Sequence, residues 1–460
     1  MKPFRTKAVS WGLALCFASF DALASDCKVL PPAASPYNYP VVLQGPSALF
    51  GLPVRNFVAF SFKRDANESK SKKPKWQKIP LQIDERNNRG EFVLEGGLPF
   101  TKDSDDFRMD ANDEFVFHGN NIGERFTQKD LQSKEIATWV RKSSGQWRLD
   151  LCNDSKDFGA VLVLAMPHES RDIVNVAVNL NVEQKKINAK QYRYEFNNAQ
   201  PALLGQIFLN REKGEMEAIA GSSFLMIAQT PWYMPDIYLG DKSFQSEIES
   251  WQVGPVRTIV AVGVKFKKFL SLFNWHMFSE LVFYENMFQI PTEIQFPFDA
   301  NKILKPGSGM VYALNFHQPH EWNITTNMQK IPQDGPAWFA KNVAGQEKQK
   351  MYFAQGQHQS RDWSFFVKVR VDEEAATRFN PPLLVQHDDF KDEKIKKAWP
   401  GLKRMSGDLG VFLDVSKVNK GAYDFGLDLV LRTGAYQSFT DYGSIQSYWQ
   451  PLFVNNTISH

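Results

Sequence analysis

Apolar and polar side chains alternate along much of the first third of this 460-residue chain. Six segments have apolar residues at every second position and are flanked by Asn, Asp, Gly or Lys: VRNFVAFSFKRD, KIPLQIDER, GEFVLEG, DEFVFHG, ATWVRKSS and QWRLDLCND. A period of two is typical of antiparallel strands that bury one face. The pattern therefore predicts an antiparallel β-sandwich.

Longer strands are predicted after Cys152. Two apolar runs come first, FGAVLVLAMP and DIVNVAVNLNVEQ, and then a series that can build wide sheets: SEIESWQVGPVRTIVAVGVKFKKF, FSELVFYENMFQIPTEIQF, GMVYALNF, WSFFVKVRV, LGVFLDV and YDFGLDLVLR. The best helical pattern is DDFKDEKIKKAWPGLKRM, where Phe390, Ile395 and Trp399 form a stripe and Pro400 ends it. We expect an all-β protein whose second domain is the larger.

The N-terminus has the pattern of a secretory signal peptide. Lys2, Arg5 and Lys7 precede an apolar run over residues 8–20, and small residues mark a cleavage site after Ala24. The run is too short to span a bilayer comfortably. We expect an exported protein, periplasmic or secreted, with no transmembrane segment after cleavage.

The mature chain is long enough for two domains. We place the boundary near Met166 and Pro167, which gives a β-sandwich domain over residues 25–166 and a larger domain over 167–460. Cys27 and Cys152 remain after cleavage, and an oxidising compartment favours a disulfide between them that closes the first domain. The alternative is two buried thiols. Without CxxC or HxxxH spacing, a zinc site is not expected.

The charge balance argues against a polyanionic partner. Cleavage removes three cations and one anion, so the net charge falls from +3 to +1. The basic cluster in ESKSKKPKW (Lys70 to Lys75) lies among Ser, Asn and Pro, and no aromatic platform or amphipathic period accompanies it. It predicts a solvated loop, and we expect no nucleic-acid partner.

Three motifs carry a resemblance to known proteins. In order they are IPLQIDER (residues 79–86), DANDEFVFHGNNIGER (110–125) and SWQVGPVRTIVAV (250–262). This order resembles a pattern in uncharacterised secreted bacterial proteins, and the GPVR element with the strands after it resembles strand pairs of β-supersandwich domains. Galactose-mutarotase-like domains and many polysaccharide-active enzymes have that fold. The resemblance implies a β-supersandwich-like second domain and a carbohydrate-related function.

The GPVR element itself predicts a bend or bulge in one long strand, because Gly254 and Pro255 interrupt the ladder. Arg257 then points to one face, where a carboxylate such as Glu247 or Glu249 is available for an ion pair. A structural arginine and a substrate clamp are both open at this point.

The acidic stretch DSDDFRMDANDEFVFHGNNIGERF has two interpretations. Asp110, Asn112 and Glu114 have the spacing of the first half of a calcium loop, but Phe115 and Asn121 occupy the positions where that loop needs Gly and Glu. The first interpretation is a turn followed by a strand, with Asp and Asn bonding their own backbone. The second is a calcium site of another type, completed by Asp103, Asp105 or Asp106, and we expect no other cofactor.

Histidines are the candidates for acid–base chemistry. His317 and His320 stand three apart in NFHQPHEWNI, and His358 lies beside Arg361 in a Gly- and Gln-rich loop. A lyase needs a His or Tyr base and a cation that stabilises the enolate-like charge. These histidines with Tyr312 and Arg361 supply those groups, and ordinary surface or core histidines are the alternative.

Other catalytic motifs give little support. There is no GxSxG element, and GSGMVYA lacks the third glycine and the helix of a dinucleotide-binding loop. Two carboxylates for glycoside hydrolysis cannot be singled out among 51 acidic residues.

Aromatic residues in a broken stretch are the candidates for ligand binding. QTPWYMPDIYLGD carries Trp232, Tyr233 and Tyr238, whose rings suit the apolar faces of sugars, with Asp236 and Asp241 for the hydroxyl groups. Trp322 is a further candidate. The alternative is a set of aromatics that cover the end of a sandwich.

We therefore expect a non-catalytic exported protein that binds a carbohydrate or another envelope component. A carbohydrate-active enzyme, foremost a polysaccharide lyase, is the first alternative, and a structural partner in an envelope complex is the second. The sequence does not predict the oligomeric state.

Overall fold

The computed structural model describes residues 40–63, 75–98, 107–153, 156–167, 176–198, 201, 204–210, 215–266, 276–296, 298–328, 352–371, 378–385, 409–433 and 453–459. Their strands pair antiparallel in four sheets, which confirms the all-β prediction. Among the described residues no helix is long and apolar enough to cross a membrane.

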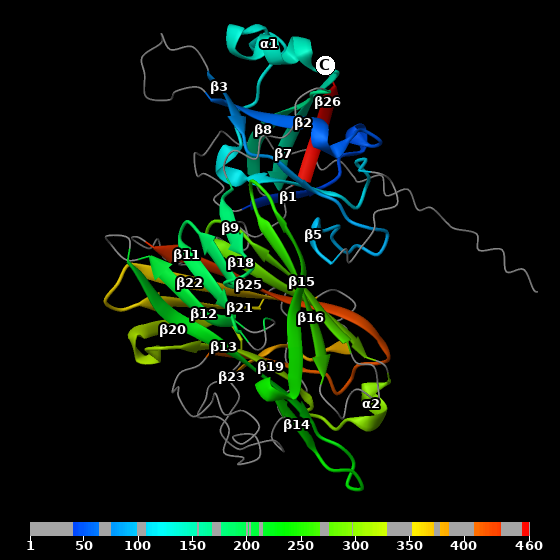
Figure 1. Cartoon of the computed structure of the whole chain (residues 1–460), viewed down its shortest axis with the longest axis vertical. Coiled ribbons are helices and arrows are strands. Elements are labelled where there is room, and N and C mark those ends of the chain that lie inside the picture. The colour runs from blue at the N-terminus through cyan, green and yellow to red at the C-terminus, as the bar shows by residue number, and fades with distance from the viewer. Residues whose placement is uncertain are drawn as a thin grey trace, which may run out of the picture.

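Two smaller sheets form an N-terminal unit at the top of the view in Figure 1. In order across it, sheet 1 contains β1 (Pro40–Gln44), β6 (Glu114–His118) and β4 (Gln82–Asp84). Sheet 2 contains β26 (Phe453–Ser459), β7 (Gly145–Asn153), β8 (Lys156–Ala165), β2 (Phe57–Lys63) and β3 (Lys75–Ile79).

Two nine-stranded sheets form the large sandwich below that unit (Figure 1). Sheet 3 contains β23 (Leu383–Val385), β24 (Leu409–Asp414), β19 (Gly309–Phe316), β13 (Met216–Ala228), β12 (Leu204–Asn210), β11 (Tyr192–Phe196), β10 (Lys186–Ala189) and β9 (Val178–Asn181), with β14 (Ile237–Gly240) paired to β13. Sheet 4 contains β20 (Trp322–Thr326), β21 (Tyr352–His358), β22 (Trp363–Val371), β25 (Gly421–Thr433), β18 (Met287–Phe296), β17 (His276–Phe283), β16 (Thr258–Phe266), β15 (Phe244–Val253) and β5 (Gly96–Gly97).

The division into domains at residues 166 and 167 stays a prediction, and the strand pairing crosses it twice. β26, near the end of the chain, pairs with β7 of the N-terminal unit, and β5 from the first part of the chain pairs with β15 of the large sandwich. Each part therefore contributes a strand to a sheet of the other.

Sheet 2 is covered on both faces, which explains why β2 and β8 are apolar along most of their length. One face packs in a core with sheet 1, and the other packs under α1 (Lys134–Lys142). The segment ATWVRKSS was predicted as a strand, and that prediction is wrong. Ile136, Trp139 and Val140 have the spacing of one helical face, and all three pack in the cluster beneath α1. The helix predicted around Phe390 to Trp399 lies outside the described residues.

The outer face of sheet 4 changes character along its strands. At the end near the N-terminal unit it is apolar, and its side chains share one core with sheet 1: Ile259, Ala261, Val282, Tyr284, Met287, Phe366 and Val430. Beyond this zone the same face carries polar residues such as Lys265, Glu280 and Glu293. The apolar zone fixes the N-terminal unit to the sandwich, and the polar zone lies beside that contact.

A buried arginine lies at this junction. The Arg257 side chain is 2% exposed, and it donates to Asp84 at 2.7 Å, to the Tyr284 hydroxyl at 2.8 Å and to Glu114. Burial alone would lower the pKa of Arg257, but Tyr284, Asp84 and Glu114 raise it well above its usual value. The prediction that Glu247 or Glu249 pairs with Arg257 is wrong, because the planar guanidinium turns toward the N-terminal unit.

The three sequence motifs converge on Arg257. Gln82 from IPLQIDER accepts the backbone N–H groups of Val256 and Arg257 at 3.0 and 2.9 Å. A side chain at Gly254 would collide with the Gln82 carboxamide, so the glycine is needed for this close approach. GPVR is the turn between β15 and β16, in which Gly254 N–H donates to Arg257 C=O at 3.0 Å. The predicted bend in one long strand is therefore a hairpin turn.

Replacing Arg257 by Met should destabilise the protein by roughly 3–5 kcal/mol, because Asp84 and Glu114 would stay buried without their cation. Chemical denaturation of the mature protein measures this change. Arg55→Met is the control, because the exposed Arg55–Glu95 pair contributes no more than about 1 kcal/mol. Equal effects of the two substitutions would contradict the anchoring role of Arg257.

The predicted disulfide stays a prediction, because Cys27 lies outside the described residues. Cys152 is buried in β7. If the pair forms and the predicted signal peptide with Cys16 is cleaved, the denatured protein should show no free thiol before reduction and two afterwards. Thiol titration with and without reductant decides this, and two thiols in both samples would rule the bond out.

Candidate functional site

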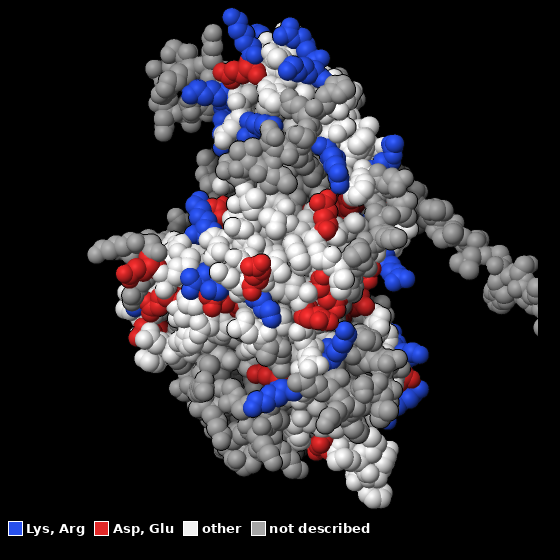
Figure 2. Space-filling model, in the orientation of Figure 1, with Lys and Arg blue, Asp and Glu red and all other residues white. Residues whose placement is uncertain are grey.

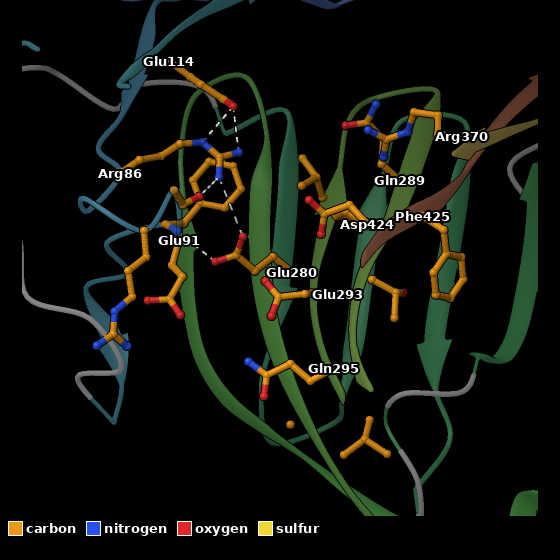
Figure 3. Close-up of a pocket in the computed structure, with 18 of the residues that line it drawn as sticks. Arg86, Glu91, Glu114, Glu280, Gln289, Glu293, Gln295, Arg370, Asp424 and Phe425 are labelled. Carbon is orange, nitrogen blue, oxygen red and sulfur yellow. Dashed lines mark hydrogen bonds and ion pairs between the residues drawn. The ribbon is translucent and has the colours of Figure 1, made fainter. Parts of the chain in front are cut away.

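A pocket of about 890 Å³ lies on the polar zone of sheet 4, next to the N-terminal unit (Figure 3). Its floor is the outer face of β16, β17, β18, β25 and β22, and its wall is the turn over residues 86–92. Charged residues line it in equal numbers: Arg86, Arg89, Arg257, Lys265, Lys368 and Arg370, with Glu91, Glu114, Glu249, Glu280, Glu293 and Asp424. The pocket therefore suits a polar ligand without a large net charge.

Two residues in the middle of the floor, Gly426 and Pro291, lack long side chains, and the Arg370 guanidinium lies over the first: a Cβ at Gly426 would be 3.0 Å from its Nη2 atom. Arg370 pairs with Gly426, Gly426 pairs with Pro291, and the pairing of Ser279 with Thr292 puts Glu280 level with Pro291. Arg370 and Glu280 are thus the two ends of a row whose middle residues are Gly426 and Pro291. Three strand spacings of about 4.8 Å put their Cα atoms roughly 14 Å apart.

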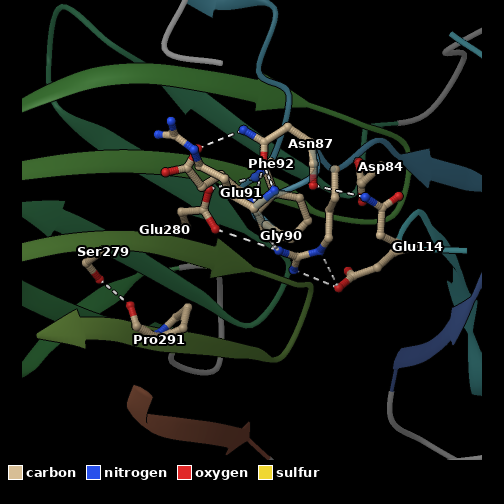
Figure 4. A network of polar contacts seen from close by, with 12 residues as sticks. Asp84, Asn87, Gly90, Glu91, Phe92, Glu114, Ser279, Glu280 and Pro291 are labelled. Carbon is tan, nitrogen blue, oxygen red and sulfur yellow. Dashed lines mark hydrogen bonds and ion pairs between the residues drawn. The ribbon is translucent and has the colours of Figure 1, made fainter. Parts of the chain in front are cut away.

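Pro291 is an unusual residue for a central strand, because it has no N–H for the ladder. The ladder between β17 and β18 is interrupted beside it, between the Ser279–Thr292 and Val282–Gln289 pairs. The Ser279 hydroxyl donates to Pro291 C=O at 2.7 Å, as Figure 4 shows. This bond holds the strands together where the ladder lacks a donor.

The wall is a turn held by its own polar groups. Asn87 accepts the N–H groups of Arg89 and Glu91 at 2.9 and 3.0 Å, and it donates to the Glu91 carboxylate at 2.7 Å. Asn112 donates to Asn87 C=O at 2.9 Å. The turn therefore keeps its shape through side-chain bonds from two separate motifs.

Arg86 connects the wall to the ion cluster. Its guanidinium bonds Glu114 at 2.9 and 2.7 Å and stacks 3.6 Å from the centre of the Phe92 ring (Figure 4). The Phe92 N–H donates to Oε1 of Glu280 at 2.8 Å. One chain of contacts thus runs from Arg257 through Glu114 and Arg86 to Glu280.

Two glutamates of this chain differ in proton affinity. Burial raises the pKa of Glu280 to about 7, against a smaller opposing effect of Arg86. Burial also favours the neutral form of Glu114, but the adjacent Arg257 and Arg86 lower its pKa below the usual value. Glu280 is therefore the group whose charge changes near neutral pH.

Carboxylates on the neighbouring strands complete the floor. Glu293 of β18 pairs with Asp424 of β25, and burial followed by repulsion from Asp424 raises the pKa of Glu293. Asp428 lies on β25 one same-face position beyond Gly426, toward the N-terminal unit, and forms an ion pair with Arg370 at 2.8 Å. Figure 3 shows Glu280, Glu293 and Asp424 side by side on the sheet.

The calcium interpretation of the acidic stretch finds no support in the geometry. Asp110 accepts the N–H groups of Asn112 and Asp113 at 2.9 and 3.3 Å, as in an Asx turn, and Glu114 is held by arginines. No group of three or more His, Cys, Asp or Glu side chains among the described residues is placed to hold a metal. Asp103, Asp105 and Asp106 lie outside those residues.

The candidate histidines lie at the edge of the sandwich, outside the pocket. His358 is buried and meets Glu321 at 3.0 Å, while its Nδ1 accepts the N–H of Ser360 at 3.3 Å. The Ser360 hydroxyl is 3.5 Å from that same nitrogen, so a serine and a histidine are neighbours, as in a serine nucleophile with its base. Nδ1 of His358, however, already accepts the Ser360 N–H. Burial lowers the pKa of His358. Its contacts hold the hairpin of β20 and β21.

Two other residues of the lyase hypothesis lie near His358: His320 Nε2 is 4.0 Å from the Glu321 carboxylate that His358 meets at 3.0 Å, and the charge of Arg361 helps to lower the pKa of His358 after burial. His317 and His320 are exposed, and Tyr312 packs in the core of the sandwich. Arg361 pairs with Glu217 at 2.8 Å and lies over the Trp363 ring. These positions favour structural roles.

The aromatic stretch forms an exposed turn between β13 and β14, at the lower end of Figure 1, where Figure 2 is mostly white. Trp232 and Tyr233 are 91% and 67% exposed. The expected hydroxyl-binding carboxylates hold the turn instead, since Asp236 accepts Thr230 N–H at 2.9 Å and Asp241 accepts Phe224 N–H at 2.6 Å.

The remaining two aromatic candidates, Trp322 and Tyr238, lie in strands. Trp322 is buried beside Phe316 and His358, and Tyr238 lies in β14. Trp232 and Tyr233 contact each other with ring centroids 5.8 Å apart, whereas Trp322 is buried in another part of the sandwich.

The pocket residues were missed because each lies in a strand of ordinary appearance. SELVF, QIPTEIQ and VKVRV contribute Glu280, Glu293 and Arg370. One signal was present: in QIPTEIQ and VKVRV polar or charged residues occupy most of the positions that alternate with the apolar ones. Their register, which brings the residues together, was not predictable.

Comparison with known proteins assigns no family. No protein-family model and no curated protein matches the chain. Among solved structures, the Slr1438 protein from Synechocystis sp. PCC 6803 matches with a TM-score of 0.29 and 8% identity, over 56% of this chain and 95% of that chain. A heparinase III, the BT4657 gene product, matches with a TM-score of 0.27 and 10% identity, over 61% of this chain and 38% of that chain. Likeness at this level carries no argument about function.

The raised pKa of Glu280 predicts a pH dependence of stability. The folded state keeps a proton on Glu280 up to about pH 7, while the unfolded chain loses it near 4.5, so stability falls as pH rises through this window. Glu280→Gln should remove this part of the fall, on the order of 2 kcal/mol. Denaturation of both proteins between pH 5 and 8 measures the difference, and a constant difference would contradict the assignment.

Proposed function

We propose that this protein binds a carbohydrate of little net charge in the pocket on sheet 4. The observation that carries the proposal is the pocket of about 890 Å³ itself, whose floor presents polar side chains from several strands of sheet 4. Its size suits an oligosaccharide rather than an ion, and it lies where two units of the fold meet, as ligand pockets often do.

The chemistry of the lining supports a polyhydroxylated ligand. Amide, carboxylate and guanidinium groups occupy the floor, including Gln289, Gln295 and Arg370. Such groups donate to and accept from neighbouring hydroxyls at the same time. The equal number of acidic and basic residues gives no field that would attract a polyanion.

The export signal belongs to this proposal as well. A protein in the periplasm or outside the cell meets envelope and environmental glycans. The exposed Trp232 and Tyr233 favour a second candidate function, in which the turn after β13 contacts an envelope partner.

Calorimetric titration of the mature protein with neutral oligosaccharides tests the proposal. Glu293→Ala and Gln295→Ala should each weaken binding about tenfold, because both side chains are exposed to the pocket. Glu183→Ala is the control, an exposed glutamate in the turn between β9 and β10 that does not line the pocket.

The outcomes separate the two candidate surfaces. Trp232→Ala should leave glycan binding unchanged, and loss of binding in this variant alone would move the site to the turn after β13. The absence of binding across the panel would overturn the proposal.

A further inference from the structure

We propose that the turn after β13 inserts its tip into the interfacial layer of a lipid bilayer with an anionic surface. This inference rests on the second candidate function, contact with an envelope partner, and names that partner as a lipid surface. The turn lies at the lower end of Figure 1, whereas the pocket on sheet 4 lies next to the N-terminal unit. One molecule can therefore hold a glycan and a bilayer at the same time.

The tip of the turn exposes apolar side chains. Trp232, Tyr233 and Met234 are 91%, 67% and 39% exposed. Residues 230–235 include no charged side chain, and the next residue, Asp236, turns its carboxylate back to accept the Thr230 N–H at 2.9 Å. Trp and Tyr are enriched at the boundary between lipid headgroups and hydrocarbon, because each has an apolar ring with one polar group.

The backbone of the turn is suited to surroundings that offer few hydrogen bonds. Pro231 and Pro235 have no N–H group. The Met234 N–H donates to Pro231 C=O at 2.9 Å, and the Thr230 hydroxyl donates to Met234 C=O at 2.7 Å. Backbone polar groups in a bilayer cost free energy unless they are bonded within the protein. These bonds reduce that cost at the tip.

Exposed lysines lie around the base of the turn. Lys305 is placed there because its N–H donates to Gln229 C=O at 2.8 Å. The short helix α2 (Ala300–Ile303) precedes Lys305, and the Asn301 N–H donates to Val418 C=O at 3.1 Å, which brings a further loop beside it. These two segments expose four lysines: Lys302, Lys305, Lys417 and Lys420.

The carboxylates near these lysines are engaged within the protein. Asp299 forms an ion pair with Lys302 at 2.7 Å and accepts the Lys420 N–H at 2.9 Å. Asp414 is 2% exposed and accepts the Asn380 amide at 2.8 Å. The described surface behind the tip is therefore more basic than acidic, and it complements the phosphate groups of an anionic bilayer.

The two rings suit lipid better than sugar. Trp232 and Tyr233 meet edge to face, with their ring planes 88° apart, so they offer no joint flat platform for a sugar ring. With lysines behind them, the rings can lie among the headgroups while the ammonium groups meet the phosphates. Apolar rings combined with basic side chains are typical of protein segments that lie in the membrane interface.

Flotation of the mature full-length chain with lipid vesicles tests the inference. The protein should bind vesicles of equimolar phosphatidylcholine and phosphatidylglycerol more tightly than vesicles of phosphatidylcholine alone, and salt should reduce the difference. Tryptophan fluorescence should shift to shorter wavelength on binding. Trp232→Phe should lose most of this shift while it still binds, because the inserted tryptophan is then absent.

Matched variants separate the two parts of the surface. Trp232→Ala should weaken binding to both kinds of vesicle at least about tenfold. Lys305→Gln should weaken binding to the mixed vesicles about fivefold and leave binding to phosphatidylcholine unchanged. Leu98→Ala and Lys134→Gln are the controls, an exposed apolar and an exposed basic residue away from the turn, and neither should change binding.

The outcomes distinguish this inference from the functions on which it builds. Absence of vesicle binding, or equal binding by the wild type and Trp232→Ala, would overturn the inference. If a cross-link to an envelope protein then depended on Trp232, the second candidate function would stand with a protein partner, and absence of that cross-link would overturn it as well. Calorimetric titration with neutral oligosaccharides reads the pocket separately, and melting curves confirm that each variant folds.

Discussion

The buried guanidinium of Arg257 is the interaction on which the rest of the site depends. It joins the turn between β15 and β16 to Asp84 of β4 and Glu114 of β6, and so ties sheet 4 to the N-terminal unit. A buried cation costs much desolvation energy unless every donor finds a partner. Asp84, Glu114 and Tyr284 supply those partners from separate parts of the chain, and this requirement specifies one docking geometry.

The same geometry creates the pocket. The N-terminal unit covers the apolar end of the outer face of sheet 4, the polar end lies beside that contact, and Arg86 and Phe92 reach its edge. Glu114 is shared by Arg257 and Arg86, which makes the position of the wall depend on the ion cluster. Glu280 in turn depends on the wall, because its only short bond to a described residue is the Phe92 N–H.

Local patterns predicted the strands well, because burial on one face imposes alternation that is visible in the sequence. They failed at α1, where Ile136, Trp139 and Val140 fit a helix better than the strand that ATWVRKSS suggested. The three motifs around Gln82, Glu114 and Arg257 were recognised as belonging together, but their contacts were not. The partners of Arg257 lie 173 and 143 residues away, and only the docking of the units brings them together.

The pocket shows the same limit. Glu280, Glu293 and Arg370 come from three strands, and no spacing along the chain indicates that they line one pocket. Their different proton affinities arise from this arrangement: burial against the wall raises the pKa of Glu280, whereas Glu293 is more exposed and is influenced by Asp424 as well as by burial. A carboxyl group becomes an acid or a base according to its surroundings. The docking of the N-terminal unit therefore both builds the wall of the pocket and sets the protonation of the residue at its edge.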